Sequence, residues 1–187
     1  MKYKYLILFS ALALIIFLVS TFAFTFLHYQ DQPSKVDVVV LFVGKDLDAR
    51  IGKANSLASA GYAEYLLVPL SNEIHPAYNG VTINAFRSSS FGKYPRHYES
   101  THVEVLEAKR IMDLYGLKKA IFISIPIQMR RLKIMTDQVF PKGYQIRFIP
   151  AQNEAASANL GGEIRQIGKM VSEYIKITWY LAYRLVS

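Results

Sequence analysis

The chain has 187 residues, the length of one domain plus an additional segment. Its 22 lysine and arginine residues exceed its 14 aspartate and glutamate residues, and the formal net charge is +8. This moderately basic balance suits a partner such as anionic lipid or an anionic small molecule, although a soluble basic surface without a specific partner has the same composition. The basic stripe with interleaved aromatic residues that indicates nucleic-acid binding is not found. There is no cysteine, which excludes disulfides, thiolate metal sites and a cysteine nucleophile.

An uncharged run of 22 residues, 6–27, follows the first two lysines. A helix needs about 20 apolar residues to cross the hydrocarbon core of a membrane, so residues 1–28 are predicted to form a transmembrane anchor. Lys2 and Lys4 precede the run, and the first charge after it is Asp31. This distribution places the N-terminus in the cytoplasm and the rest of the chain outside, in the periplasm if the source is Gram-negative. Residues 29–35 form a linker, and 36–187 form one domain.

A cleaved signal peptide is the competing interpretation of the same segment. Signal peptides have an apolar region of about 7–15 residues that ends in a small-x-small cleavage site. Thr21-Phe22-Ala23 is a poor version of such a site and lies inside the apolar run. We therefore expect a single-pass protein of the cytoplasmic membrane, with the lipid bilayer as a partner. A cytoplasmic domain on a reversed anchor is the remaining alternative.

Strand-like and helix-like stretches alternate along the rest of the chain. This alternation predicts an α/β fold, a Rossmann-like three-layer sandwich with a mainly parallel sheet of about five strands. The predicted strands are 36–43, 65–68, 81–86, 120–125 and 144–149, the last nearest an edge; the predicted helices are 48–60, 100–115, 128–138 and 162–185. Ligands in such folds bind at the carboxyl ends of the strands. The segments expected there are 44–50, 70–79, 98–104 and 126–131.

The start of the helix at 100–115 has two interpretations. Thr101-x-x-Glu104 is typical of a capping box, in which the hydroxyl and the carboxylate satisfy backbone N–H groups. Alternatively, Ser100, Thr101 and the helix amides receive an anion, as helix N-termini readily do. In both cases the helix dipole disfavours protonation of His102 in the first turn.

Two adjacent arginines, Arg130 and Arg131, open the helix after the strand at 120–125. Positive charge at a helix start opposes the helix dipole, so helix stability does not explain them. One of them could bind phosphate or carboxylate through two hydrogen bonds, and a solvated basic face is the alternative. Asp48 and Arg50 follow the first strand in the same way, and Asp48 could simply cap its helix.

The sequence contains no recognisable metal or hydrolase motif. The histidines do not cluster, and the H-E-x-x-H, G-x-S-x-G and P-loop patterns are absent. Gly44 is a single glycine where a dinucleotide fingerprint has three. We therefore predict no metal site, and the sequence assigns no cofactor.

Three stretches resemble the YdcF-like family, which includes the membrane-anchored SanA and ElyC envelope proteins. Residues 100–104 (STHVE) resemble the family's S-T-x-E-E helix start, and residues 123–131 (ISIPIQMRR) resemble its V-T-S-P-x-H-M-x-R block. Residues 173–176 (EYIK) resemble the E-x-x-K of its last helix. Arg50 and Gly61 match the opening strand–helix unit, and the similarity covers roughly residues 36–180.

The chain also departs from the pattern of that family. Residues 42–45 (FVGK) replace a glycine-rich turn after the first strand, and 69–71 (PLS) replace an S-G-G after the second. The histidine of the fourth-strand block is Gln128, which cannot carry out acid–base chemistry because an amide does not titrate. The positions that match are Thr101, Glu104 and Arg131.

The resemblance implies a Rossmann-like fold and a role in envelope biogenesis or barrier function. One hypothesis is an enzyme, or a degenerate enzyme, that acts on an anionic or lipid-linked cell-wall intermediate with Glu104 as base or ligand. The other is a non-catalytic binding or scaffold protein of the membrane surface that uses the same pocket. The predicted ligand-binding residues are Gly44, Arg50, Ser100, Thr101, Gln128 and, as a charge clamp, Arg131.

Overall fold

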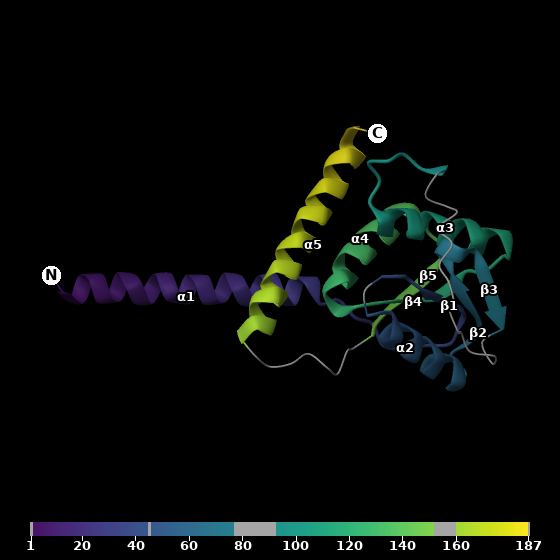
Figure 1. The fold of residues 1–187 in the computed structure, drawn as a ribbon, viewed down its shortest axis with the longest axis horizontal. Coiled ribbons are helices and arrows are strands. Elements are labelled where there is room, and N and C mark those ends of the chain that lie inside the picture. The colour runs from purple at the N-terminus through teal and green to yellow at the C-terminus, as the bar shows by residue number, and fades with distance from the viewer. Residues whose placement is uncertain (1, 45, 77–92, 152–159, 187) are drawn as a thin grey trace.

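Residues 2–44, 46–76, 93–151 and 160–186 are described by the computed structural model, which is built around one five-stranded sheet (Figure 1). The strand order is β3 (Glu73–Pro76), β2 (Ala63–Val68), β1 (Val36–Leu41), β4 (Lys119–Ser124) and β5 (Gln145–Pro150). The pair β2–β3 is antiparallel and the other pairs are parallel. The helices are α1 (Lys2–Leu27), α2 (Leu47–Ser59), α3 (Ser100–Leu114), α4 (Met129–Val139) and α5 (Leu160–Val186), with short 3-10 turns η1 (Pro69–Ser71) and η4 (Pro126–Gln128).

Apolar side chains of the sheet pack on both of its faces, because successive residues of a strand point in opposite directions. On one face, Val38, Val40 and Phe122 belong to a cluster that includes residues of α3, α4 and α5. On the other face, Val39 and Ile121 belong to a cluster with α2. The result is a helix–sheet–helix sandwich. The predicted α/β class and the mainly parallel sheet of five strands are confirmed.

Part of the segment 70–79, which we expected only as a connection at the carboxyl end of a strand, forms a further strand. Asn72 does form a turn, with a left-handed backbone at φ 56°. The chain then reverses and pairs Glu73–Pro76 with β2. Only one of those four residues, Ile74, is strongly apolar, so the alternation that marks a strand is too short to detect. The predicted strand at 81–86 lies outside the described residues.

Helix α1 extends away from the sheet, and its C-terminal end is joined to the domain (Figure 1). Arg130 Nε donates a hydrogen bond to Phe26 O at 2.7 Å, and Tyr174 OH donates one to Ala23 O at 2.7 Å. In the part of the chain that the structure describes, no helix combines the length and the apolar character needed to cross a membrane. The predicted transmembrane anchor is therefore not supported by the structure and stays a prediction.

Candidate functional site

The order of the strands reverses beside β1. The chain runs from β1 to β2 and β3 on one side, and later adds β4 and β5 on the other side. A reversal of this kind separates the loops at the carboxyl ends of two neighbouring strands, and open α/β sheets bind their ligands there. In this protein the loop after β1 and the η4 turn after β4 flank that position. Phe42 N donates to Ile123 O at 3.2 Å, which holds the two strand ends together.

The Glu104 side chain reaches this position from α3. Glu104 is only 3% exposed, and its Oε2 accepts a hydrogen bond from Val43 N at 2.8 Å. The carboxyl group therefore joins α3 to the loop after β1. The capping-box interpretation of Thr101 and Glu104 is wrong, because Glu104 binds a distant backbone amide.

Glu99 caps α3 instead. Its carboxylate accepts a hydrogen bond from Thr101 N at 2.8 Å and one from Ser100 Oγ at 3.2 Å. A carboxylate at this position satisfies an otherwise unpaired N–H and interacts favourably with the helix dipole. The chain thus supplies its own anion at the helix start. The described hydrogen bonds of Ser100 and Thr101 go to Glu99, so the structure does not bring these two predicted ligand contacts to Glu104.

Burial raises the pKa of Glu104 from 4.5 to about 8, because an ionised carboxylate would lose its hydration there. The Val43 N–H and the Arg50 guanidinium lower the pKa, but their combined effect is smaller than that of burial. Much of Glu104 is therefore protonated at neutral pH. A carboxyl group that titrates near neutrality can donate or accept a proton under working conditions, which is a frequent property of catalytic groups.

The Arg50 side chain links three segments at the same position. It extends from the first turn of α2, and the residue is 1% exposed. Its Nη1 donates to Phe42 O at 2.7 Å, and its Nη2 donates to Gln128 Oε1 at 3.2 Å. Its Nε is buried and has no hydrogen-bond partner among the described residues. Burial lowers the pKa of Arg50, while the nearby Glu104 and Asp46 carboxylates act in the opposite direction.

Gly44 and Gln128 complete this group. A Cβ atom at Gly44 would lie 3.1 Å from Arg50 Nη2, so a glycine allows the guanidinium to approach the backbone. Gln128 Oε1 accepts a hydrogen bond from Ser124 Oγ at 2.9 Å in addition to the one from Arg50. Gln128 therefore acts as an acceptor that fixes its neighbours. The predicted residues that the structure brings together are Gly44, Arg50, Glu104 and Gln128.

Arg131 is also buried, at 1% exposure, but its charge is already neutralised within the chain. Its Nε donates to Glu173 Oε2 at 2.5 Å. Its Nη1 lies 2.7 Å from Glu99 Oε2 and forms an ion pair with it. Lys176 Nζ lies 3.2 Å from the second oxygen of Glu173. The predicted charge clamp thus binds two carboxylates of its own chain, and its contact with a ligand stays a prediction.

Sequence reasoning missed Glu99 and Glu173 as partners of Arg131. Glu99 carried a usable signal, since an acidic residue directly before a helix is typical of an N-cap. Glu173 lies 42 residues from Arg131 in sequence. Their contact depends on where α5 packs, which no local pattern indicates.

His102 has a structural role. It is 2% exposed, and its Nδ1 lies 2.8 Å from Tyr183 OH. Burial, together with a smaller contribution from the positive charge of Arg184, lowers the pKa of His102 to about 4. The sequence predicted a poorly protonated histidine because of the helix dipole, whereas the larger cause in the structure is burial.

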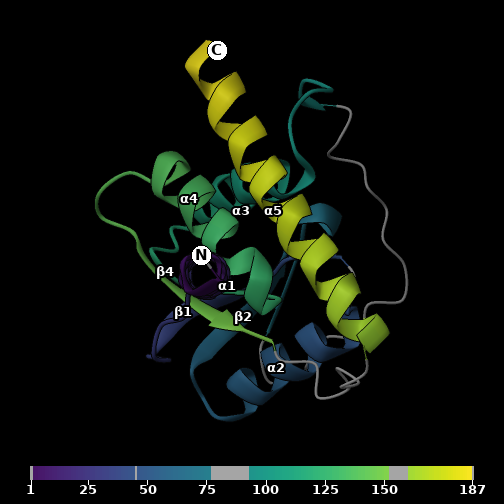
Figure 2. The ribbon, with the colours of Figure 1, turned by 90° about the vertical axis from the view of Figure 1, so that its left-hand side faces the viewer.

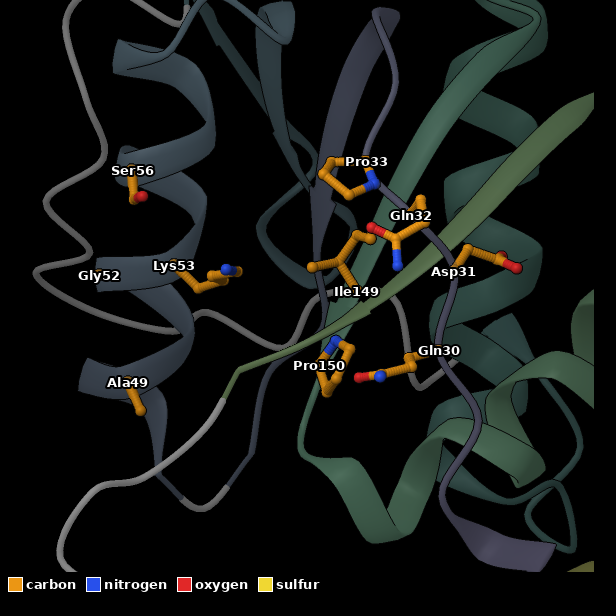
Figure 3. A pocket seen from close by; sticks show the side chains of 10 residues that line it. All are labelled: Gln30, Asp31, Gln32, Pro33, Ala49, Gly52, Lys53, Ser56, Ile149 and Pro150. Atoms are coloured by element: carbon orange, nitrogen blue, oxygen red, sulfur yellow. The ribbon is translucent and has the colours of Figure 1, made fainter.

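A separate open pocket of about 550 Å³ lies between α2, the linker and the end of β5 (Figure 3). Lys53 projects into it from α2, and Asp31 lies on the opposite side in the linker (Figure 3). Asp31 is already bound, because it accepts hydrogen bonds from Tyr29 OH and Phe148 N. None of the predicted site residues lines this pocket. Among the described residues there is also no group of three or more side chains that could hold a metal ion.

Comparison with known families, curated proteins and solved structures gives no match to this chain. The candidate site is therefore defined by geometry. It consists of the buried polar groups at the carboxyl ends of β1 and β4.

Proposed function

We propose that this protein is a membrane-anchored, extracytoplasmic protein of the YdcF-like type that acts in envelope biogenesis or barrier function. Its ligand would be anionic, such as a lipid-linked envelope precursor, and would bind at the carboxyl ends of β1 and β4. The observation that carries this proposal is the state of Arg50. Its guanidinium is buried, forms none of the described ion pairs, and has an Nε without a hydrogen-bond partner among the described residues.

A buried cation with incomplete pairing is unfavourable, and a bound anion would reduce that cost. Arg131 provides an internal comparison, because the carboxylates of Glu99 and Glu173 already neutralise it. Among the carboxyl groups that act on Arg50, Glu104 has the largest effect, but its pKa of about 8 keeps much of it uncharged at neutral pH. Arg50 is therefore the group we assign to the ligand.

The proposed anchor is supported by the uncharged run at 6–27 and by side-chain exposure. Phe9, Leu14, Phe17 and Phe22 are each more than half exposed. Successive residues of a helix are about 100° apart, so these four side chains point in four different directions around α1. A helix that is apolar on all sides is typical of a membrane span or a buried core. The structure contains no helix of spanning character among its described residues, so this proposal rests on the uncharged run and on the exposure of these side chains.

The raised pKa of Glu104 favours a second candidate function, acid–base catalysis on the bound ligand. A general acid or base works best when its pKa lies close to the operating pH. In both candidates Arg50 binds the anion. Glu104 then determines whether the protein turns its ligand over or only holds it.

A thermal-shift experiment tests the ligand site. The full chain would be placed in nanodiscs of zwitterionic lipid and melted with and without pyrophosphate or farnesyl diphosphate. A ligand at 100 times its Kd stabilises the folded state by about 2.7 kcal/mol, which corresponds to an increase in Tm of roughly 5–10 °C for a chain of this size. Pyrophosphate supplies the anion alone, and farnesyl diphosphate adds a lipid chain.

Two matched variants serve this test. Arg50→Gln removes the buried charge, and Arg147→Gln removes an exposed arginine from β5. We expect the ligand-induced shift to persist in Arg147→Gln and to vanish in Arg50→Gln, whatever the Tm of each variant without ligand. An equal shift in Arg50→Gln would exclude this site.

Glu104→Gln separates the two candidate functions. Release of phosphate from farnesyl diphosphate that is lost in Glu104→Gln would support catalysis. Retained binding in the wild type without any turnover would support a binding protein.

A further inference from the structure

Helix α5 carries an exposed apolar stripe. Ile167, Val171, Ile175 and Trp179 are 61%, 53%, 64% and 52% exposed. Residues four apart on a helix are offset by only about 40°, so these side chains form one continuous strip along α5. The opposite side of α5 carries Tyr180, which is fully buried in the core of the domain. The stripe is therefore turned away from the core of the domain, and at its C-terminal end Trp179 Nε1 donates a hydrogen bond to His97 O at 3.1 Å.

The stripe is continuous with the apolar surface of α1. A cavity of about 640 Å³ lies between the two helices, and its lining includes Phe17 and Phe24 from α1 and Ile167 and Val171 from α5. The ring of Tyr174 stacks on Phe26 with centroids 6.1 Å apart, and its OH donates to the backbone of α1. The apolar surface of α5 thus begins where α1 meets the domain.

The two helices cross steeply. Figure 1 shows α5 passing across the C-terminal part of α1, and Figure 2, which looks along α1 from its N-terminal end, shows α5 lying across the near side of the domain. A membrane spanned by α1 would lie across the axis of α1, so α5 would run roughly along its surface. The α1 residues that line the cavity extend from Phe17 to Phe24. At a rise of 1.5 Å per residue, they lie about 5–15 Å from Leu27 along α1, toward the interior of the membrane. That depth corresponds to the outer leaflet.

The exposed charges of α5 also suit a lipid surface. Over residues 165–186 of this helix, the acidic residue is Glu173, which is 3% exposed and paired with Arg131. The accessible charges are all basic, and none lies within the apolar stripe. They are Arg165, Lys169, Lys176 and Arg184. An apolar strip with basic side chains on the remaining circumference is typical of helices that lie in the interface of an anionic membrane.

We propose that α5 is a second membrane-binding element, which lies in the outer leaflet of an anionic bilayer with Ile167, Val171, Ile175 and Trp179 inserted. This inference rests on the proposed α1 anchor. The α1 span fixes the distance of the domain from the membrane, and the contact of α5 with the bilayer fixes the rotation of the domain about α1. Because Glu173 on the other side of α5 holds Arg131, membrane docking of α5 also positions the buried ion pairs next to the candidate site.

Trp179 makes the proposal measurable, since it is the only tryptophan of the chain. The full chain would be reconstituted in vesicles of phosphatidylcholine and phosphatidylglycerol, with bromine placed on the acyl chains either near the headgroup or near the methyl end. We expect headgroup-proximal bromine to quench Trp179 fluorescence strongly, distal bromine to quench it weakly, and aqueous acrylamide to have little effect. Replacing phosphatidylglycerol by phosphatidylcholine should reduce the quenching.

Variants with a charge in the stripe provide the second arm. Val171→Glu and Ile175→Glu should abolish quenching by brominated lipid, while Leu114→Glu, which charges an exposed leucine of α3 at 70% exposure, should leave it unchanged. Quenching of the wild type by acrylamide but not by brominated lipid would overturn the proposal. Protection of Trp179 from both quenchers, together with a dimer in mass photometry, would also overturn it and would assign the stripe to a second copy of the chain.

Extraction with alkaline carbonate separates this inference from the anchor. A chain that resists extraction but has unquenched Trp179 contradicts the role of α5 alone. A chain released by carbonate contradicts the α1 anchor.

Discussion

Replacing Glu104 by glutamine tests whether burial controls the protonation of the candidate site. The pKa of Glu104 is raised from 4.5 in the unfolded chain to about 8 in the folded protein. Between these values the folded state retains a proton that the unfolded chain has released, so the free energy of unfolding falls as the pH rises. The slope is about 1.4 kcal/mol per pH unit, which gives roughly 4 kcal/mol between pH 5 and pH 8.

Glutamine has nearly the same shape and does not titrate, so Glu104→Gln should lack this pH dependence. We expect the variant to resemble the wild type at pH 5 and to exceed its Tm at pH 8 by about 10 °C. Near-ultraviolet circular dichroism of the full chain in micelles would follow the melting. Glu64→Gln, which changes an exposed glutamate of β2, is the matched control and should follow the wild type. Parallel curves for Glu104→Gln and the wild type would refute the raised pKa.

Three further substitutions probe the surrounding network. Arg131→Met should lower the free energy of unfolding, measured in urea, by about 3–5 kcal/mol, because the carboxylates of Glu99 and Glu173 would lose a buried counter-ion. Arg147→Met is the exposed control. If Arg131→Met lowered the free energy of unfolding by less than Arg147→Met does, the ion-pair assignment would be contradicted. Gly44→Ala should lower the free energy of unfolding by about 1–3 kcal/mol, because the added methyl group would press on Arg50 Nη2. An unchanged Tm would argue against the close approach of Arg50 to the backbone at Gly44. Acidification from pH 6.5 to pH 4 should destabilise the wild type relative to His102→Gln by up to about 3 kcal/mol, since a pKa lowered to about 4 means that the folded state resists a proton that the unfolded chain takes up. The opposite effect of Glu104 is common to both proteins, so the difference between their melting curves isolates His102, and identical curves would rule out His102 as the cause.

The fold could be predicted from the sequence where the pattern is local and long. The valine-rich stretch that became β1 and the helical spacing that became α3 each indicated the correct element. Strand β3 could not be predicted in this way, because its pairing partner is β2 and its four residues carry no pattern of their own. An antiparallel edge strand that follows a tight turn forms because it pairs with the neighbouring strand, here β2, and a local sequence pattern does not describe that pairing.

The candidate site was predictable in part, because the carboxyl ends of parallel strands meet at one edge. That rule selected Gly44, Arg50, Glu104 and Gln128, and the hydrogen bonds of Arg50 and Glu104 place these residues in one network. The rule could not indicate charge pairing. The sequence treated Arg131 as a group available to a ligand, whereas tertiary packing gives it two carboxylates from α5 and the start of α3.

The state of Arg50 Nε is the most direct test of the anion site. Within the described parts of the chain this nitrogen has no hydrogen-bond partner, whereas Arg131 Nε is already bound to Glu173. Nitrogen-15 NMR of the guanidinium Nε–H groups during a pyrophosphate titration would therefore observe both side chains together, with Arg50→Lys to assign the signal. We expect the Hε signal of Arg50 to move downfield as it acquires an anionic acceptor, while that of Arg131 stays in place. A titration that leaves Arg50 unchanged, or that moves Arg131 instead, would contradict the proposed site.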